Sequence, residues 1–320
     1  MIKACLFIAA IALTIVPAAR ADEAFPTHPI RFIVPFSPGG GTDGQCRVLA
    51  EAAGKRLGQA IIVENLAGAG GTIGFNMAAR ADPDGYTILS ATPAFATNPF
   101  IQKGVAYDPE KDFAPVIHAT TSPVILVAVT ESPIHTVQDL LDAARAHPGQ
   151  IHYGSAGIGS IAHLSAALLG ALGHVQLTHV PYRGSEPAMI DLLAGRLEIL
   201  VDNATSVLPR IRSGQLRAIG VGTAAKYSLL PDVPTIAETI PGYESSSWLG
   251  VLVPAKTPRP VIDRLNAAFN DSLLDPEVRK ALAGFGTELI AGPPEVFGVY
   301  LKAKLVELKS VAGAANLIPR

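Results

Sequence analysis

The sequence feature that most constrains the fold is the stretch of residues 30–43, where an apolar run meets two prolines and three glycines before a helical pattern begins. Glycine has no Cβ, so a ligand can approach the backbone closely at residues 39–41. A strand, a glycine-rich turn and a helix N-terminus together form a site for an anion, because the first N–H groups of a helix have no partner inside it. A strand-to-helix turn that binds nothing explains the same stretch equally well. This segment alone leaves both interpretations open.

A helix is expected directly after this turn. Thr42 or Asp43 is the predicted N-cap, because a side-chain oxygen at that position accepts a hydrogen bond from the first helical turn. Gly58 stands where the helix should end. The apolar face repeats at helical spacing and consists of Cys46, Leu49, Ala50, Ala53 and Leu57.

The first half of the chain alternates strands and helices, which predicts parallel α/β layers. Two more glycine-rich turns precede helical patterns, at residues 68–74 and 154–160. Thr92 and Asp202 each stand at the end of a predicted strand. Because the carboxyl ends of the strands line the ligand crevice of an open α/β sheet, we expect these turns and polar residues to lie along it.

The remaining predicted elements continue this pattern. Strands are expected over residues 60–63, 86–93, 113–116, 124–129, 175–180, 197–201, 216–221 and 248–253. Helices are expected over residues 137–146, 187–194, 261–274 and 294–311. The prolines after residue 230 are typical of a chain that returns to its first domain before two closing helices.

Residues 1–21 have the pattern of a secretory signal peptide. Lys3 supplies the positive charge, residues 4–16 are apolar, and residues 19–21 form a small-x-small cleavage site. The apolar run is too short to span a bilayer as a helix. We therefore expect an exported, soluble chain that begins at Asp22.

The charge of the mature chain excludes one class of partner. Cleavage removes Lys3 and Arg20 from the 25 basic residues and none of the 27 acidic ones, so 23 basic residues remain and the net charge is −4. A nucleic-acid-binding protein needs a basic face, so we expect no nucleic acid. Cys46 alone survives cleavage, so no intramolecular disulfide can form, and its place on the apolar helix face predicts a buried structural thiol.

No catalytic or metal centre emerges from the histidines. The eight are scattered, and no Cys, Glu or His cluster has the spacing of metal ligands, so we expect neither a metal nor a cofactor. His163 lies in the helix after the third glycine turn, where a structural role and a role in the cleft both fit. Arg183 follows a predicted strand and either pairs with a carboxylate or is solvated.

Two motifs resemble enzyme signatures. Gly39-x-Gly41-x-x-Gly44, with Glu64 placed 20 residues later, matches the dinucleotide-binding fingerprint. Prolines separate the strand from these glycines, the same style of turn recurs twice, and an exported chain is not expected to meet nicotinamide cofactors. The segment around Ser37 resembles a nucleophile elbow, but its bulky neighbour and the following proline do not suit that strained turn.

A set of motifs runs in order through the whole mature chain. They are PIRFIVPFSPGG at 29–40 with Asp43, GQ at 58–59, VEN at 63–65, GAGG at 68–71 with IG at 73–74, PDGYT at 83–87, YGSAG at 153–157 with GS at 159–160 and HL at 163–164, VPYRG at 180–184, LPDVPT at 230–235, and WLG at 248–250 with Pro254. Together they resemble the substrate-binding proteins of tripartite tricarboxylate transporters, the Bug family of periplasmic receptors.

The resemblance implies a type II periplasmic-binding-protein fold, in which two α/β lobes close on a carboxylated solute. Lobe 1 would comprise residues 22–122 and 226–320, and lobe 2 residues 123–225. The protein would be a periplasmic monomer and not an enzyme. Its partners would be a small carboxylic acid and a two-component membrane permease.

Family pockets hold carboxylates largely through backbone amides and ordered water. On one wall the resemblance places Phe36, Ser37, Gly40 and Asp43, with Gly70, Gly71 and Thr92 nearby. From the second lobe it places Ser155, Gly159, Ser160, His163 and Asp202. The alternative is an exported α/β hydrolase or isomerase that uses Ser37 with His163. A receptor returns its ligand unchanged, which distinguishes the two.

Overall fold

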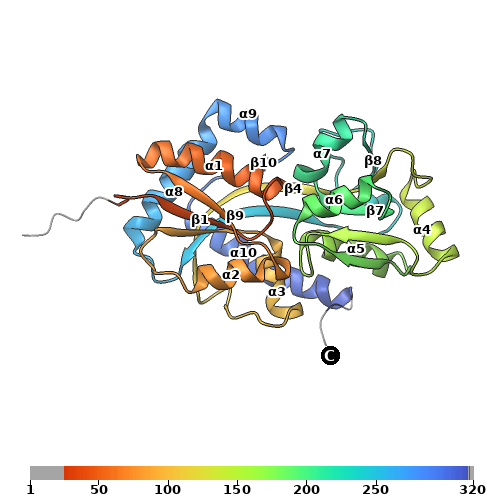
Figure 1. Cartoon of the computed structure of the whole chain (residues 1–320), viewed down its shortest axis with the longest axis horizontal. Helices are drawn as coiled ribbons and strands as arrows, with labels where there is room; N and C mark the ends of the chain where they lie inside the picture. The colour runs from red at the N-terminus through yellow and green to blue at the C-terminus, as the bar shows by residue number, and fades with distance from the viewer. Residues whose placement is uncertain (1–24, 316, 318–320) are drawn as a thin grey trace, which may run out of the picture.

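The computed structural model describes residues 25–315 and residue 317. The predicted signal peptide, residues 1–21, lies outside the described residues. Within the part of the chain that is described, no helix is long and apolar enough to cross a membrane. Two α/β lobes lie side by side, joined by the long strands β4 and β9 that run between them (Figure 1).

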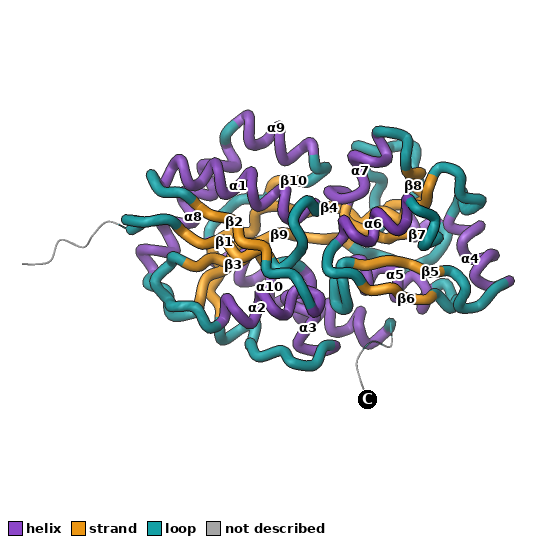
Figure 2. Tube along the Cα trace, viewed as in Figure 1, coloured by secondary structure: helices purple, strands orange, loops and turns teal. Residues whose placement is uncertain are grey.

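The first lobe is built on a largely parallel sheet. β1 (Ile30–Val34) pairs in parallel with β2 (Ile61–Asn65) and β3 (Thr87–Ala91), and β3 pairs antiparallel with β9 (Ser246–Pro254). Because side chains alternate along a strand, Phe32 and Ile33 enter the cores on opposite faces of the sheet. One face is covered by α1 (Gly41–Leu57), α8 (Arg259–Leu274) and α9 (Pro276–Gly284). The other is covered by α2 (Thr72–Ala79), α3 (Pro93–Ile101) and α10 (Pro294–Ala314) (Figure 2).

The second lobe repeats this layering. β5 (His152–Ser155) pairs in parallel with β6 (Thr178–Pro181) and β7 (Ile199–Asn203). β7 and β8 (Leu216–Val221) both pair antiparallel with β4. α4 (Val137–Ala146) and α5 (Ile161–Leu172) cover one face, and α6 (Ser185–Leu193) and α7 (Ala204–Arg212) cover the other.

β4 (Phe113–Val129) belongs to both lobes. Its first part pairs with β9, from Phe113 opposite Pro254 to Pro123 opposite Ser246, and its last part pairs with β7 and β8. The prediction of two separate strands, over 113–116 and 124–129, is therefore wrong. Register shifts after Pro115 and after His118 absorb the irregular middle of the strand, and β10 (Glu288–Leu289) pairs there with residues 120–121.

We propose lobe boundaries that follow these cores. The first crossing stays near residue 122, as expected from the sequence. Ile236, Ile240 and Tyr243 lie in the same core as Val124 and Ile219 of the second lobe. This packing supports a return to the first lobe at about residue 245 instead of at 226.

The local predictions for α1 are partly confirmed. The helix ends at Gly58, which has the left-handed conformation (φ 73°) that suits glycine. The N-cap is Gly40 and not Thr42 or Asp43, and it makes no side-chain cap. Helices α3, α7 and α9 are present although no pattern predicted them.

Candidate ligand-binding site

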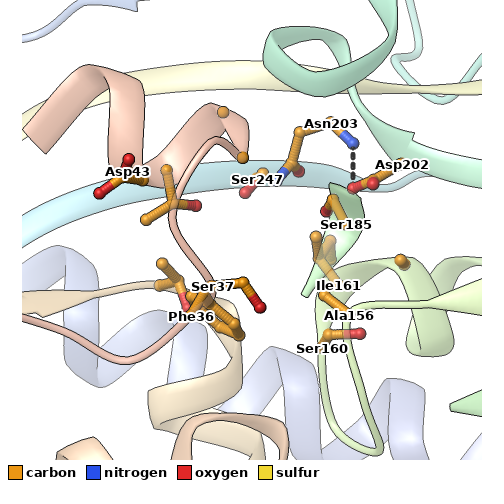
Figure 3. Close-up of a pocket in the computed structure, with 15 residues that line it drawn as sticks. Phe36, Ser37, Asp43, Ala156, Ser160, Ile161, Ser185, Asp202, Asn203 and Ser247 are labelled. Atoms are coloured by element: carbon orange, nitrogen blue, oxygen red, sulfur yellow. Dashed lines mark hydrogen bonds between the residues drawn. The ribbon is translucent and has the colours of Figure 1, made fainter. Parts of the chain in front are cut away.

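The two lobes enclose a narrow cleft, which has little free space inside it in this structure. Figure 3 shows residues of the two lobes facing each other across it, with Ser247 of the linking strand β9 between them. The first lobe contributes Phe36, Ser37, Gly40, Gly41, Thr42, Asp43 and Thr92. The second lobe contributes Ala156, Ser160, Ile161, Ala162, Ser185, Asp202 and Asn203.

Five helices begin at this cleft. Each has an N-cap that lines the cleft or directly precedes a lining residue: Gly40 for α1, Thr92 for α3, Ser160 for α5, Gly184 for α6 and Asn203 for α7. The first N–H groups of a helix have no partner inside it, and its dipole places positive charge at that end. The cleft is therefore surrounded by groups that favour an anion.

Buried polar atoms in the cleft lack protein partners. Among the described residues, nothing hydrogen-bonds Thr92 Oγ1 or Asn203 Oδ1, and both residues line the cleft. Buried polar atoms in proteins are nearly always paired. A ligand or water held in the cleft would complete these two groups.

The Asp43 carboxylate shapes the glycine turn. It accepts hydrogen bonds from Gly39 N at 3.0 Å, Arg47 Nε at 2.9 Å and Asn65 Nδ2 at 2.9 Å. Burial by itself would raise the pKa of Asp43, but these hydrogen bonds hold that pKa below its usual range. Asp43 thus lines the cleft, but its oxygens serve to fix the backbone that presents the α1 amides.

Hydrogen bonds join the two lobes beside the cleft. Ser37 Oγ donates to the carbonyl of Arg183 at 2.8 Å, and Gln102 Nε2 donates to the carbonyl of Ile158. Across the same gap a Cβ added to Gly41 would lie 2.2 Å from Thr205 Oγ1. The lobes are in close contact in this structure, and small residues permit that contact.

Seven of the twelve residues predicted for the site line the cleft, and five lie elsewhere. The seven are Phe36, Ser37, Gly40, Asp43, Thr92, Ser160 and Asp202. Gly70 packs against the Ile158 carbonyl of the other lobe, and Gly159 packs against Asn98. Gly71 contacts Phe75. These three glycines all have positive φ, so they shape the turns beside the cleft.

Ser155 and His163 belong to a network behind the cleft wall. Ser155 Oγ is hydrogen-bonded to Gly157 and lies 2.6 Å from His179 Nε2. The His163 ring stacks on His179 with centroids 4.0 Å apart, and its Nδ1 accepts from Gly159 N at 3.2 Å. Burial lowers the pKa of His163 to about 4, and burial together with the charge of His163 lowers that of His179 to about 3.

The hydrolase alternative finds no support in this arrangement. The Ser37 hydroxyl donates to a backbone carbonyl, and His163 accepts from Gly159. Within the described chain no hydrogen bond joins Ser37 to a histidine, so the pairing of Ser37 with His163 that this alternative names is not seen. The described residues also hold no cluster of three or more His, Cys, Asp or Glu side chains that suits a metal ion.

Several cleft residues were not among those predicted. Gly41, Thr42, Ile161 and Ala162 are helix-start residues beside predicted ones, and Asn203 follows Asp202. Ser185 begins α6 directly after the Arg183-Gly184 motif, two residues before the predicted start of that helix at residue 187. Ser247 comes from the return segment and only tertiary pairing brings it here.

The comparisons with known proteins agree with this geometry. Residues 45–303 match the family model described as the tripartite tricarboxylate transporter family receptor. The UPF0065 protein of the tcbD-tcbE intergenic region of Pseudomonas sp. strain P51 is 41% identical over 288 residues, which is 89% of this chain and 86% of that protein.

Two solved structures are similar over nearly the whole chain. The periplasmic binding protein BugD is 33% identical and superposes with a TM-score of 0.89, covering 92% of this chain and 100% of that one. R. palustris Rpa4515, solved with adipate, is 34% identical with the same TM-score and the same coverage. The predicted α/β fold of the type II periplasmic-binding-protein class is confirmed. The chain belongs to the TctC/Bug family of solute-binding receptors, which are not enzymes.

Proposed function

We propose that this protein captures a small carboxylated solute between its lobes and delivers it to the two-component membrane permease of a tripartite transporter. The observation that carries the proposal is the set of five helix N-termini at one cleft. In the part of the chain that the structure describes, no lysine or arginine lines the cleft. Recognition of negative charge would therefore come from N–H and hydroxyl donors.

The relatives support the same assignment. The R. palustris protein was solved with adipate, a small dicarboxylate, and the family is named for a three-component transporter. BugD is a periplasmic protein, and the signal-peptide pattern of residues 1–21 supports the same compartment for this chain. We propose that it acts there as a monomer.

We propose two roles for the predicted site residues. The seven that line the cleft, with Ser185, Asn203 and Ser247, would contact the ligand or the water around it. Gly70, Gly71, Gly159, Ser155 and His163 would shape the turns that bring the lobes together.

A thermal-shift screen of small carboxylic acids tests the function. A ligand present at 100 times its Kd stabilises the folded protein by about 2.7 kcal/mol. We expect at least one carboxylic acid to raise the melting temperature, and the matched uncharged amide to have no effect. The acid should be recovered chemically unchanged. A panel in which amides or amines stabilise and no acid does would contradict the proposal.

Ligand binding should also close the lobes. The hydrogen bonds of Ser37 and Gln102 join residues of different lobes, so they can form only when the cleft is shut. We expect small-angle scattering to give a smaller radius of gyration with saturating ligand than without it. The emission of Trp248, which lies buried on the linking strand β9, provides a second readout. An unchanged radius at saturation would count against closure.

A further inference from the structure

We propose that Asp202 makes the cleft selective for carboxylic acids that carry a hydrogen-bond donor near the carboxylate, best of all an ammonium group. The inference rests on the proposed function and names the class of acid that the site would prefer. It arises from the polarity of one part of the cleft, where Asp202 and Asn203 stand at the carboxyl end of β7.

The Asp202 carboxylate is buried without a cation. Asp202 is only 2% exposed. It accepts a hydrogen bond from Asn203 N at 2.7 Å, and the Ser185 side chain beside it favours the charged form. Among the described residues, no lysine, arginine or histidine lines the cleft beside it. A buried charge without a partner is costly, so a positive or donor group of the ligand would be favoured there.

The atoms beside Asp202 also favour a hydrogen-bond donor of the ligand. Asn203 Oδ1 is an acceptor, and it is buried without a partner among the residues that the structure describes. In Figure 3 Asp202, Asn203 and Ser185 lie together on one side of the cleft, opposite Ser37 and Phe36. A ligand atom placed against this group meets a carboxylate and an amide oxygen, both of which accept hydrogen bonds.

The remainder of the cleft is complementary to the other end of such an acid. The N-termini of α1 and α5 present backbone N–H groups through Gly41, Thr42, Ile161 and Ala162. These favour the ligand carboxylate, while a carboxylate placed at Asp202 would meet like charge. An amino acid or a hydroxy acid carries both a carboxylate for the helix N-termini and a hydrogen-bond donor for Asp202. A plain dicarboxylate carries only carboxylates.

Other charged groups around Asp202 have partners of their own. Asp43, across the cleft, is paired with Arg47 at 2.9 Å. Glu186 on α6 is paired with Arg210 on α7 at 2.7 Å. On α5 and β6, His163 and His179 have pKa values lowered to about 4 and about 3, so both are neutral near pH 7.

Matched pairs of acids test the proposal by calorimetric titration at pH 7.5. The pairs are L-aspartate and L-malate against succinate, and L-2-aminoadipate against adipate. In the pair that binds, we expect the donor-bearing acid to bind at least about tenfold more tightly, equivalent to about 1.4 kcal/mol. The amino and hydroxy members separate an ammonium preference from a general donor preference.

The Asp202→Asn variant isolates the carboxylate. It keeps the shape of the side chain but removes its charge, so we expect the preference to shrink to within about threefold. Asp142→Asn, an exposed substitution on α4 of the same lobe, is the matched control and should keep the wild-type preference. Asp202→Asn should fold at least as stably as the wild type, because it removes an unpaired buried charge.

A pH series on the wild-type protein, with Asp202→Asn as its control, gives a second readout. Burial raises the pKa of Asp202 to about 6. Between pH 7.5 and 5.5 the affinity for the donor-bearing acid should fall as a proton occupies Asp202, and that for the donor-free acid should rise. The ligands also take up protons in this pH range. The same series on Asp202→Asn, which lacks the titrating carboxyl group, measures that contribution so that it can be subtracted from the wild-type result.

Two results would overturn the inference while the proposed function stands. One is tighter binding of the donor-free acid at pH 7.5. The other is an Asp202→Asn variant with an unchanged preference. If no acid from any pair and no acid in the wider screen binds, the proposed function fails and the inference fails with it.

Discussion

Gly41→Ala should lower ligand affinity at least about a hundredfold, equivalent to about 2.7 kcal/mol, while the protein stays folded. Gly41 is the first residue of α1 and lines the cleft. A Cβ there would lie 2.2 Å from Thr205 Oγ1 and 2.9 Å from the Thr205 backbone carbon in the other lobe. Backbone atoms cannot turn aside as a flexible side chain can, so the methyl group would hold the lobes apart.

The unliganded protein should tolerate this change. Gly41 has no positive φ, and alanine suits a helix better than glycine. Gly284→Ala is the matched control, since Gly284 on α9 is not among the residues that line the cleft and a Cβ there would meet nothing within 4 Å. We expect Gly284→Ala to bind the ligand as tightly as the wild type does. Calorimetric titration measures both variants, and scattering with ligand shows whether Gly41→Ala stays open. Equal affinities for the two variants would contradict this account of closure.

The elements predicted correctly are those with strong local chemistry. α4 begins at Thr136, whose side chain and Asp139 form a capping box, and it has the predicted bounds. β8 also has the predicted bounds, as an apolar run between polar ends. Such signals depend on neighbours in the sequence, so they can be recognised without the fold.

The cleft residues that could be predicted are those whose positions follow from the topology of α/β sheets. Thr92 and Asp202 stand at strand ends, and the Gly40 turn follows β1, so the rule for carboxyl ends places all three correctly. Ser247 could not be found in this way. It lies near the start of β9, which enters the cleft only because β9 pairs with β4.

Which glycines of the turns face the cleft could not be predicted from the sequence. Gly40 faces the cleft, whereas Gly70 and Gly159 have φ of 60° and 85° and pack against neighbouring turns and side chains. The sequence does not distinguish a glycine that lets a ligand approach from a glycine that forms a left-handed turn or a close contact. His163 is similar, since its place in the helix did not reveal that its ring stacks on His179.

Lowering the pH from 7 to 5 should destabilise the protein, chiefly through buried histidines. His118 lies on β4 and is 4% exposed, with its ring 4.2 Å from that of Tyr300 on α10. Burial lowers the pKa of His118 to about 4, and burial does the same for His163. The unfolded chain therefore binds more protons than the folded one between pH 6.5 and 4. Stability is lost as the pH falls through this window, by about 2 kcal/mol for each of these two histidines between pH 7 and 5.

Asp202 acts in the opposite direction. Its folded pKa of about 6 lies above the usual value for aspartate, so the stability it contributes is greatest at low pH and is lost as the pH rises towards 6. This offsets about 1 kcal/mol of the histidine effect between pH 7 and 5. The net expectation is a loss of at least about 2 kcal/mol, measured by urea unfolding at the two pH values.

His118→Phe should remove about 2 kcal/mol of this pH dependence. The His118 ring lies among the rings of Trp248, Phe297 and Tyr300. Its Nε2 is buried without a partner among the described residues, so an apolar ring of similar shape loses no hydrogen bond at that atom and cannot take up a proton. His147→Gln, at an exposed position after α4, is the control and should keep the wild-type slope. If His118→Phe loses as much stability as the wild type between pH 7 and 5, His118 is not the group whose protonation destabilises the fold.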